Sequence, residues 1–176
     1  MTRRRALLAG TLAAVLAVAV VLAVVLGGAD GDDRPAPGTG PAALAYARAW
    51  DATCRALDAD ARGTTALLRA RLGDRDPSAS TRRTLTRRVV EPYLGRTGRR
   101  LLRLAATAPP PEWRAYHRDA AVSLRRAADR TAVARGRARA GDASGLTAFD
   151  AGVATATPAP EALRRRTPAC TASSGA

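Results

Sequence analysis

An apolar stretch near the start of this chain limits where the rest of the chain can lie. Residues 6–26 read ALLAGTLAAVLAVAVVLAVVL and contain no charged side chain. A helix rises about 1.5 Å per residue, so a helix of this length extends about 30 Å, the thickness of the hydrocarbon core of a bilayer. The stretch also lacks the polar stripe that a helix packed on a globular domain normally carries. It therefore predicts a transmembrane helix.

The flanks of this stretch predict its orientation. Residues 1–5 include three consecutive arginines, and positively charged flanks stay on the cytoplasmic side. The chain after residue 26 is then expected outside, as a single-pass protein of the cell membrane. A cleavable signal peptide is the alternative, since residues 27–29 are small, and the protein would then be secreted. The stretch exceeds the about 7–15 apolar residues of a typical signal peptide, which favours the uncleaved anchor.

Composition divides the remaining chain into three parts. Residues 27–40, GGADGDDRPAPGTG, have no apolar side chain larger than Ala or Pro, which predicts a flexible, disordered linker. Residues 41–170 are long enough to form one domain with one core, which we expect to be a helical bundle. Residues 171–176 are expected to form a disordered tail.

The first half of this domain shows two helical patterns. Residues 41–72 carry apolar side chains at three- and four-residue steps, which predicts an amphipathic helix that Gly63 ends or weakens. The members of this face are Tyr46, Trp50, Thr53, Cys54, Leu57 and Ala61. A second helix is expected to begin at Ser78 or Ser80, the two candidate caps, and to be kinked or divided by Pro92.

The second half begins with a proline run at residues 109–111, which ends the preceding helix. Residues 112–140 are predicted to form the longest uninterrupted helix, ended by Gly141. Leu146, Phe149, Val153 and Ala156 indicate a short further helix, and residues 161–166 one more turn. No run alternates every second residue, so we expect an all-α fold, an antiparallel bundle of about four helices.

The two cysteines, Cys54 and Cys170, predict a disulfide, because an even number of cysteines outside the cytoplasm normally pairs. The bond would join the first helix of the domain to its C-terminal tail. Closing so long a loop stabilises the fold by about 4 kcal/mol in the chain-entropy model. Two free buried thiols are the alternative.

The charge of the chain indicates an anionic partner. All 29 basic residues are arginines, against 15 acidic ones, and the net charge is +14. The densest segment, residues 82–103, holds eight arginines and one acid. On a helix, four of these arginines fall within an arc of about 100° and predict an anion-binding face: Arg96, Arg99, Arg100 and Arg103.

The expected partners of this face follow from its chemistry and from the predicted location. A planar guanidinium can bind two phosphate oxygens, so anionic lipid, wall polymer or an acidic protein would suit it. The alternative is a solvated face paired with aspartates of other helices. We do not expect nucleic acid, because the domain is predicted to lie outside and only Tyr93 interleaves with the arginines as a stacking aromatic.

Motifs for catalysis or cofactor binding are absent from the sequence. No phosphate loop, dinucleotide-binding glycine pattern or metal-ligand spacing occurs, and His117 is the only histidine. We therefore expect no catalytic residue, metal or cofactor, and no enzyme activity. The leading hypothesis is a membrane-anchored, extracytoplasmic binding or scaffolding domain.

Two alternative functions remain open. A small-ligand carrier would need a pocket between helices, and the aromatic candidates for its lining, or otherwise for the core, are Trp50, Trp113, Tyr116 and Phe149. An envelope enzyme of an unrecognised type is the other alternative.

The layout of the chain resembles a group of proteins. It combines a predicted N-terminal anchor, a low-complexity linker, Cys54 in the first helix, a proline-rich break before Trp113-x-x-Tyr116-His117, and a closing Cys170. This layout is similar to that of small uncharacterised extracytoplasmic helical proteins of actinobacteria. The resemblance implies a helical bundle closed by one disulfide. It carries over neither an activity nor any functional residue.

Overall fold

A computed structural model describes residues 40–72, 77–142 and 158–172. These residues form helices and connecting turns without a strand, so the predicted all-α class is confirmed for them. The predicted anchor at residues 6–26 and the short helix predicted around Phe149 lie outside the described residues. None of the helices in the described ranges combines the length and the apolar character that crossing a bilayer requires.

The first helix, α2 (Pro41–Leu72), contains 32 residues and passes through Gly63 without a break. A Cβ at Gly63 would meet nothing within 4 Å, so this glycine lies on the open side of the helix. Glycine lowers helix stability by roughly 0.5–1 kcal/mol relative to alanine, which the burial of the flanking Ala61 and Thr64 offsets. α2 is therefore longer than the helix that the sequence predicted to be the longest.

The second long helix has three consecutive parts, α3 (Ala79–Leu85), the π turn η2 (Thr86–Val90) and α4 (Glu91–Ala105). Ser78 caps its start, since the Ser78 hydroxyl accepts a hydrogen bond from the Thr81 N–H at 3.1 Å. In the π turn, the Glu91 N–H donates to the Thr86 carbonyl, five residues back. The wider turn accommodates Pro92, which has no N–H and crowds the carbonyl four residues before it. Of the two effects expected of Pro92, a kink or a division, the division does not occur, because helical turns continue from η2 into α4.

The third long helix follows a proline-rich connection. The short 3₁₀ turn η3 (Pro111–Trp113) leads into α5 (Arg114–Ala140), which contains 27 residues. α5 ends at Gly141 as predicted. Gly141 adopts the left-handed conformation with φ 83°, and its N–H donates to the Ala138 carbonyl at 2.9 Å. A residue with a side chain is strained in this conformation, which explains the glycine at the end of the helix.

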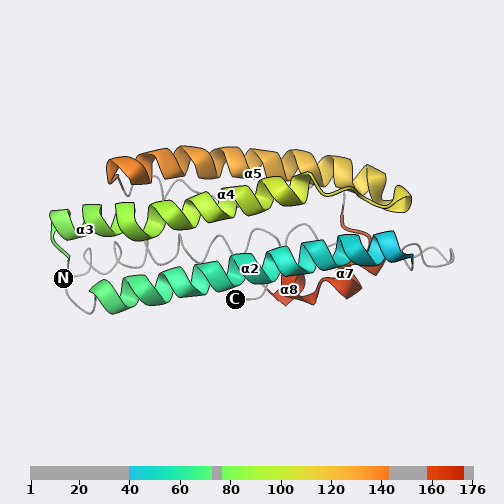
Figure 1. The fold of residues 1–176 in the computed structure, drawn as a ribbon, viewed down its shortest axis with the longest axis horizontal. Helices are drawn as coiled ribbons and strands as arrows, with labels where there is room; N and C mark the ends of the chain where they lie inside the picture. Colours follow the sequence, from blue (N-terminus) through green and yellow to red (C-terminus); the bar gives the residue numbers. More distant parts are fainter. Residues whose placement is uncertain (1–39, 73–76, 143–157, 173–176) are drawn as a thin grey trace.

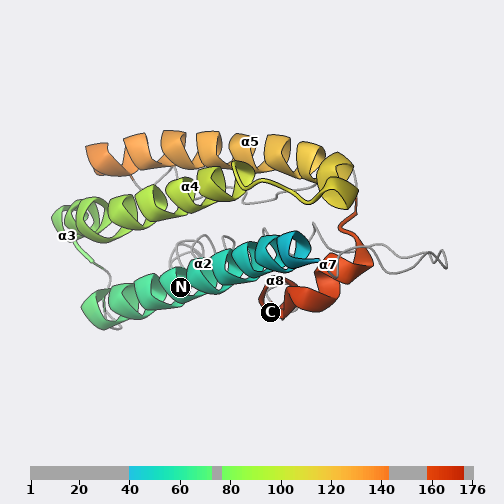
Figure 2. The ribbon, with the colours of Figure 1, turned by 45° about the vertical axis from the view of Figure 1, so that its right-hand side comes forward.

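Helix α4 lies between α2 and α5 and runs antiparallel to both (Figures 1 and 2). Alanines on the inner side of α5 let α4 approach closely, and a Cβ on Gly98 would lie 3.6 Å from the Thr131 side chain. At one end of the bundle, the short helices α7 (Glu161–Arg166) and α8 (Pro168–Ala172) pack against α2. The described part thus has about four helices, as expected for the bundle.

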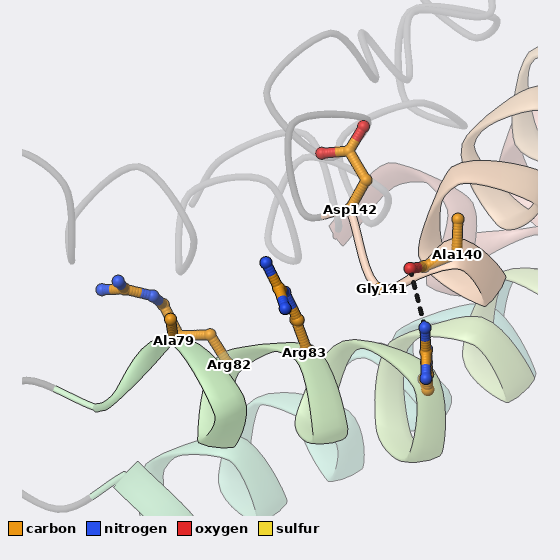
Figure 3. A pocket seen from close by; sticks show the side chains of 7 residues that line it. Ala79, Arg82, Arg83, Ala140, Gly141 and Asp142 are labelled. Carbon is orange, nitrogen blue, oxygen red and sulfur yellow. Dashed lines mark hydrogen bonds between the residues drawn. The ribbon is translucent and has the colours of Figure 1, made fainter.

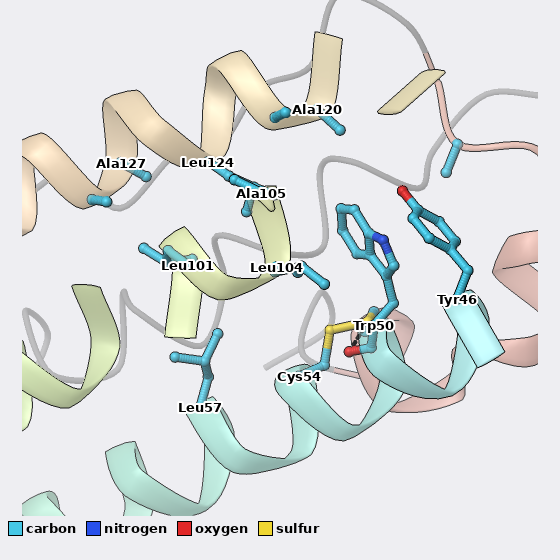
Figure 4. Close-up of a cluster of buried hydrophobic side chains, with 14 of the residues drawn as sticks. Tyr46, Trp50, Cys54, Leu57, Leu101, Leu104, Ala105, Ala120, Leu124 and Ala127 are labelled. Atoms are coloured by element: carbon cyan, nitrogen blue, oxygen red, sulfur yellow. Dashed lines mark hydrogen bonds between the residues drawn. A yellow bond between two sulfur atoms is a disulfide. The ribbon is translucent and has the colours of Figure 1, made fainter. Parts of the chain in front are cut away.

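The predicted disulfide between Cys54 and Cys170 is confirmed, and it joins α8 to α2 (Figure 4). Beside it, the buried carboxylate of Asp51 accepts a hydrogen bond from the Ala169 N–H at 2.9 Å. Helix α8 extends two residues into the segment that the sequence assigned to a tail. The C-terminal helices are therefore attached to α2 by a covalent bond and by a charge-assisted hydrogen bond.

Candidate anion-binding site

The four predicted arginines of α4 do not form one free face. The Arg96 Nε donates to one carboxylate oxygen of Asp60 at 3.3 Å, and the Arg100 Nε donates to the other at 3.1 Å. Asp60 belongs to α2, and its side chain is only 18% exposed. These two arginines therefore connect α4 to α2, which is the pairing with another helix that the sequence left open as the alternative.

The other two arginines, Arg99 and Arg103, are exposed on the outer side of α4. Neither forms an ion pair with any residue that the structure describes. Leu102 lies between them in sequence and is 49% exposed. The free part of the predicted site is thus two guanidinium groups around one exposed apolar side chain.

A second arginine cluster lies where the start of α4 meets the end of α5. The Glu91 carboxylate accepts from the Arg135 Nε at 2.7 Å and from an Arg139 Nη at 3.0 Å. The hydrogen bond from Arg135, followed in size of effect by the one from Arg139, holds the pKa of the Glu91 carboxyl below its usual value. This clamp fixes the last turns of α5 against α4.

Next to the clamp is an open cleft between α3 and the end of α5 (Figure 3). Its volume is about 550 Å³, and the residues that line it are Ala79, Arg82, Arg83, Arg87, Ala140, Gly141 and Asp142. An Nη of Arg87 donates to the Ala140 carbonyl at 3.0 Å. A Cβ at Gly141 would lie 3.1 Å from the Arg87 Nε, so the missing side chain lets α3 and α5 come together here.

The sequence did not identify this cleft as a site. Its arginines belong to the basic segment 82–103, which was recognised, but their partner surface comes from residues more than fifty positions later. A helical wheel compares residues within one helix. It therefore gives no information on which arginines meet the end of another helix.

The aromatic pocket candidates lie together in the core. Trp50 and Trp113 are each 1% exposed and Tyr116 is 3% exposed. The ring centroids of Trp50 and Tyr116 are 5.9 Å apart, and Tyr46 lies 5.6 Å from Trp113. Ring pairs at such distances are typical of packed aromatic cores. Phe149, the fourth candidate, lies outside the described residues.

His117 of α5 lies at the edge of this cluster, half-buried. Its Nδ1 is 2.9 Å from the Tyr46 hydroxyl, which can donate to it. Desolvation lowers the pKa of His117, and the nearby charge of Arg125 lowers it further, against a hydrogen bond to the Ala105 backbone that raises it. Within the described ranges, no group of three or more potential metal ligands comes together.

The lowered pKa of His117 predicts a pH effect on stability. The unfolded chain binds a proton at this site more readily than the folded one, so stability is complete above the ordinary histidine pKa of 6.5 and decreases as the pH falls below it. We expect a lower melting temperature at pH 5.5 than at pH 7.5. The change is small, because the ring is half-exposed and solvent screens its charge.

The variant His117→Gln provides the control, since glutamine can still accept from Tyr46 but does not titrate. Its melting temperature, measured by circular dichroism, should change less between the two pH values than that of the natural protein. Identical changes in both proteins would contradict this assignment.

No protein-family model matches the chain, and no curated protein or solved structure matches it. The resemblance to extracytoplasmic actinobacterial proteins stays an expectation from the layout of the sequence.

Proposed function

We propose that the chain is a membrane-anchored binding domain without enzyme activity, which lies outside the cytoplasm and contacts anionic material of the cell envelope. The apolar segment 6–26 and the arginines before it support the anchor and its orientation. The disulfide between Cys54 and Cys170 supports an oxidising compartment, because such bonds are rare in the cytosol. The net charge of +14 supports an anionic partner.

The observation that carries the binding role is the exposed pair Arg99 and Arg103 with Leu102 between them. Two guanidinium groups can each bind phosphate oxygens of lipid headgroups, and an exposed leucine beside them can enter the interface. The linker of 14 residues has a root-mean-square length of about 20 Å. It therefore keeps the bundle within reach of the bilayer that holds the anchor.

The proposed location has a direct test in cells. The full chain should remain in the membrane fraction after an alkaline wash, and protease added to intact spheroplasts should degrade the bundle. Thiol alkylation of the exported chain should require a reductant. An intact, soluble chain in the cytosol with both thiols reactive would refute the anchor, the orientation and the envelope role.

The proposed lipid contact can be tested by arginine footprinting of the full chain in nanodiscs. Phenylglyoxal modifies accessible guanidinium groups, and mass spectrometry reports the rate at each arginine. In discs that contain phosphatidylglycerol, we expect Arg99 and Arg103 to react about fivefold more slowly than in discs of phosphatidylcholine, which corresponds to about 1 kcal/mol.

Arg48 is the internal control, since it is exposed on α2 and forms no ion pair within the described residues. Its reaction rate should be the same in both kinds of disc. Equal protection of Arg48 would indicate a diffuse electrostatic attraction, and unprotected Arg99 and Arg103 would refute the lipid contact.

A further inference from the structure

The cleft between α3 and the end of α5 carries two kinds of binding group. Arg82 and Arg83 are exposed, and neither forms an ion pair with a described residue. Across the cleft are the Asp142 carboxylate and the C-terminal carbonyl groups of α5 (Figure 3). The cleft therefore presents hydrogen-bond donors of positive charge on one wall and hydrogen-bond acceptors on the other.

This mixture does not suit a bare anion. The carboxyl end of a helix carries a partial negative charge, and Asp142 adds a full one, so both repel an anion that has acceptors only. A ligand that also carries hydroxyl groups can offset this repulsion, because its hydroxyls can donate hydrogen bonds to the Asp142 carboxylate. A carboxylate has about four acceptor sites, so a carboxylate that already takes part in an interaction, as that of Asp142 does, can accept further hydrogen bonds.

We propose that the cleft binds a polyol phosphate, with its phosphate held by Arg82 and Arg83 and its hydroxyl groups donating to Asp142. The volume of about 550 Å³ exceeds what a phosphate group alone requires and lies within the range of small-molecule sites. Glycerol phosphate is the smallest ligand of this class that contains both kinds of group.

The cleft is preformed rather than assembled by the ligand. The bond from Arg87 to the Ala140 carbonyl fixes η2 against the last turn of α5, and the Glu91 clamp fixes the preceding turn. Gly141 allows these elements to approach closely, since a Cβ there would lie 3.1 Å from the Arg87 Nε and 3.4 Å from the Arg83 Cβ. Walls that are already in place need no rearrangement when the ligand arrives, so binding has to order only the exposed side chains of Arg82 and Arg83.

This inference deepens the proposed function, on which it depends for the source of the ligand but not for the chemistry of the site. The glycerol phosphate group can belong to a phosphatidylglycerol headgroup or to a soluble polymer of polyol phosphate. The cleft and the pair Arg99 and Arg103 use different residues, so their tests can fail independently.

The test uses the full chain in phosphatidylcholine nanodiscs and isothermal titration with two probes, sn-glycerol 3-phosphate and propyl phosphate, which has no hydroxyl group. We expect the glycerol compound to bind about tenfold more tightly. The variant Arg82→Gln with Arg83→Gln should weaken binding of both probes at least about tenfold. The variant Arg125→Gln with Arg126→Gln removes the same charge from exposed positions on α5 and should change either affinity less than about twofold.

Asp142→Asn separates this site from a merely basic surface. It removes the repulsion and weakens the acceptor, so propyl phosphate should bind at least as tightly as to the natural protein, and the preference for the glycerol compound should disappear. No binding of sn-glycerol 3-phosphate, equal losses in both arginine double variants, or an undiminished preference in Asp142→Asn would each overturn the proposal.

Competition then identifies the source. Phosphatidylglycerol in the disc displaces the glycerol probe if the cleft reaches the bilayer, and soluble poly(glycerol phosphate) displaces it if the cleft binds a polymer. Each outcome supports the site. Unprotected Arg99 and Arg103 together with tight binding of the glycerol probe would refute the lipid contact of α4 and leave the cleft in place.

Discussion

Removing the disulfide by the double change Cys54→Ala and Cys170→Ala should lower the free energy of unfolding by about 4 kcal/mol. The bond connects residues separated by 116 positions, so it excludes a large share of the conformations of the unfolded chain. For a domain of this size, such a loss lowers the melting temperature by about 10–20 °C. Urea denaturation of the extracted protein, followed by circular dichroism, measures the loss directly.

Alanine is the appropriate replacement, because both cysteines are buried and serine would add a hydroxyl group that needs a partner. Reduction of the natural protein with dithiothreitol is the matched control and should produce a loss of similar size. If the reduced protein and the natural protein unfold at the same urea concentration, the disulfide does not stabilise the fold in the expected way.

The loss should begin at the C-terminal helices. α7 and α8 are short, and α8 is attached to α2 by the disulfide and by the bond from Ala169 to Asp51. Isolated helices of this length are not stable in water. Hydrogen exchange should therefore accelerate in α8 before it does in α4 and α5, which pack against each other along their length.

The sequence was sufficient to predict features that depend on residues near one another in the chain or on the number of residues of one kind. Two cysteines allow one pairing within a chain, and the periodicity around Trp50 identified the buried face of α2. Gly141 ended α5 as its conformational freedom predicts. These features depend on the residues themselves or on their near neighbours in the chain.

Local rules were less informative where packing competes with them. Gly63 did not end α2, because its neighbours on the buried side are held in the core. Pro92 did not divide the second helix. The π turn before it contains one residue more than an α-helical turn, and this wider turn makes room for the proline ring. In both cases tertiary contacts or a local change of helical geometry outweighed the preference of one residue.

The candidate site was predictable only in part, for a different reason. The spacing of Arg96, Arg99, Arg100 and Arg103 fixes their relative directions, but it gives no information on what lies opposite. Asp60 accepts hydrogen bonds from Arg96 and Arg100, and it precedes Arg96 by 36 positions in the chain. The cleft likewise forms from the start of one helix and the end of another, and only the fold brings these two ends together.

Trp50→Ala should be the most destabilising single substitution in the described core, with a loss of about 3–5 kcal/mol. The indole is 1% exposed and contacts the rings of Tyr46 and Tyr116, with centroid distances of 6.1 Å and 5.9 Å. Its removal leaves a cavity beside the disulfide, where the Cys170 sulfur lies 3.7 Å from the Trp50 carbonyl (Figure 4). Urea denaturation measures the loss, and Leu102→Ala, at an exposed position, should change stability by less than about 0.5 kcal/mol.

The same variant tests whether stability and binding reside in different parts of the molecule. Trp50 is about 33 Å from the end of α2 that lies nearest the cleft, since 22 residues of helix separate it from Leu72. At a temperature where Trp50→Ala is still folded, sn-glycerol 3-phosphate should therefore bind with the affinity of the natural protein. Lost affinity in the folded variant would mean that the aromatic cluster contributes to the site, because no residue that lines the cleft would have changed.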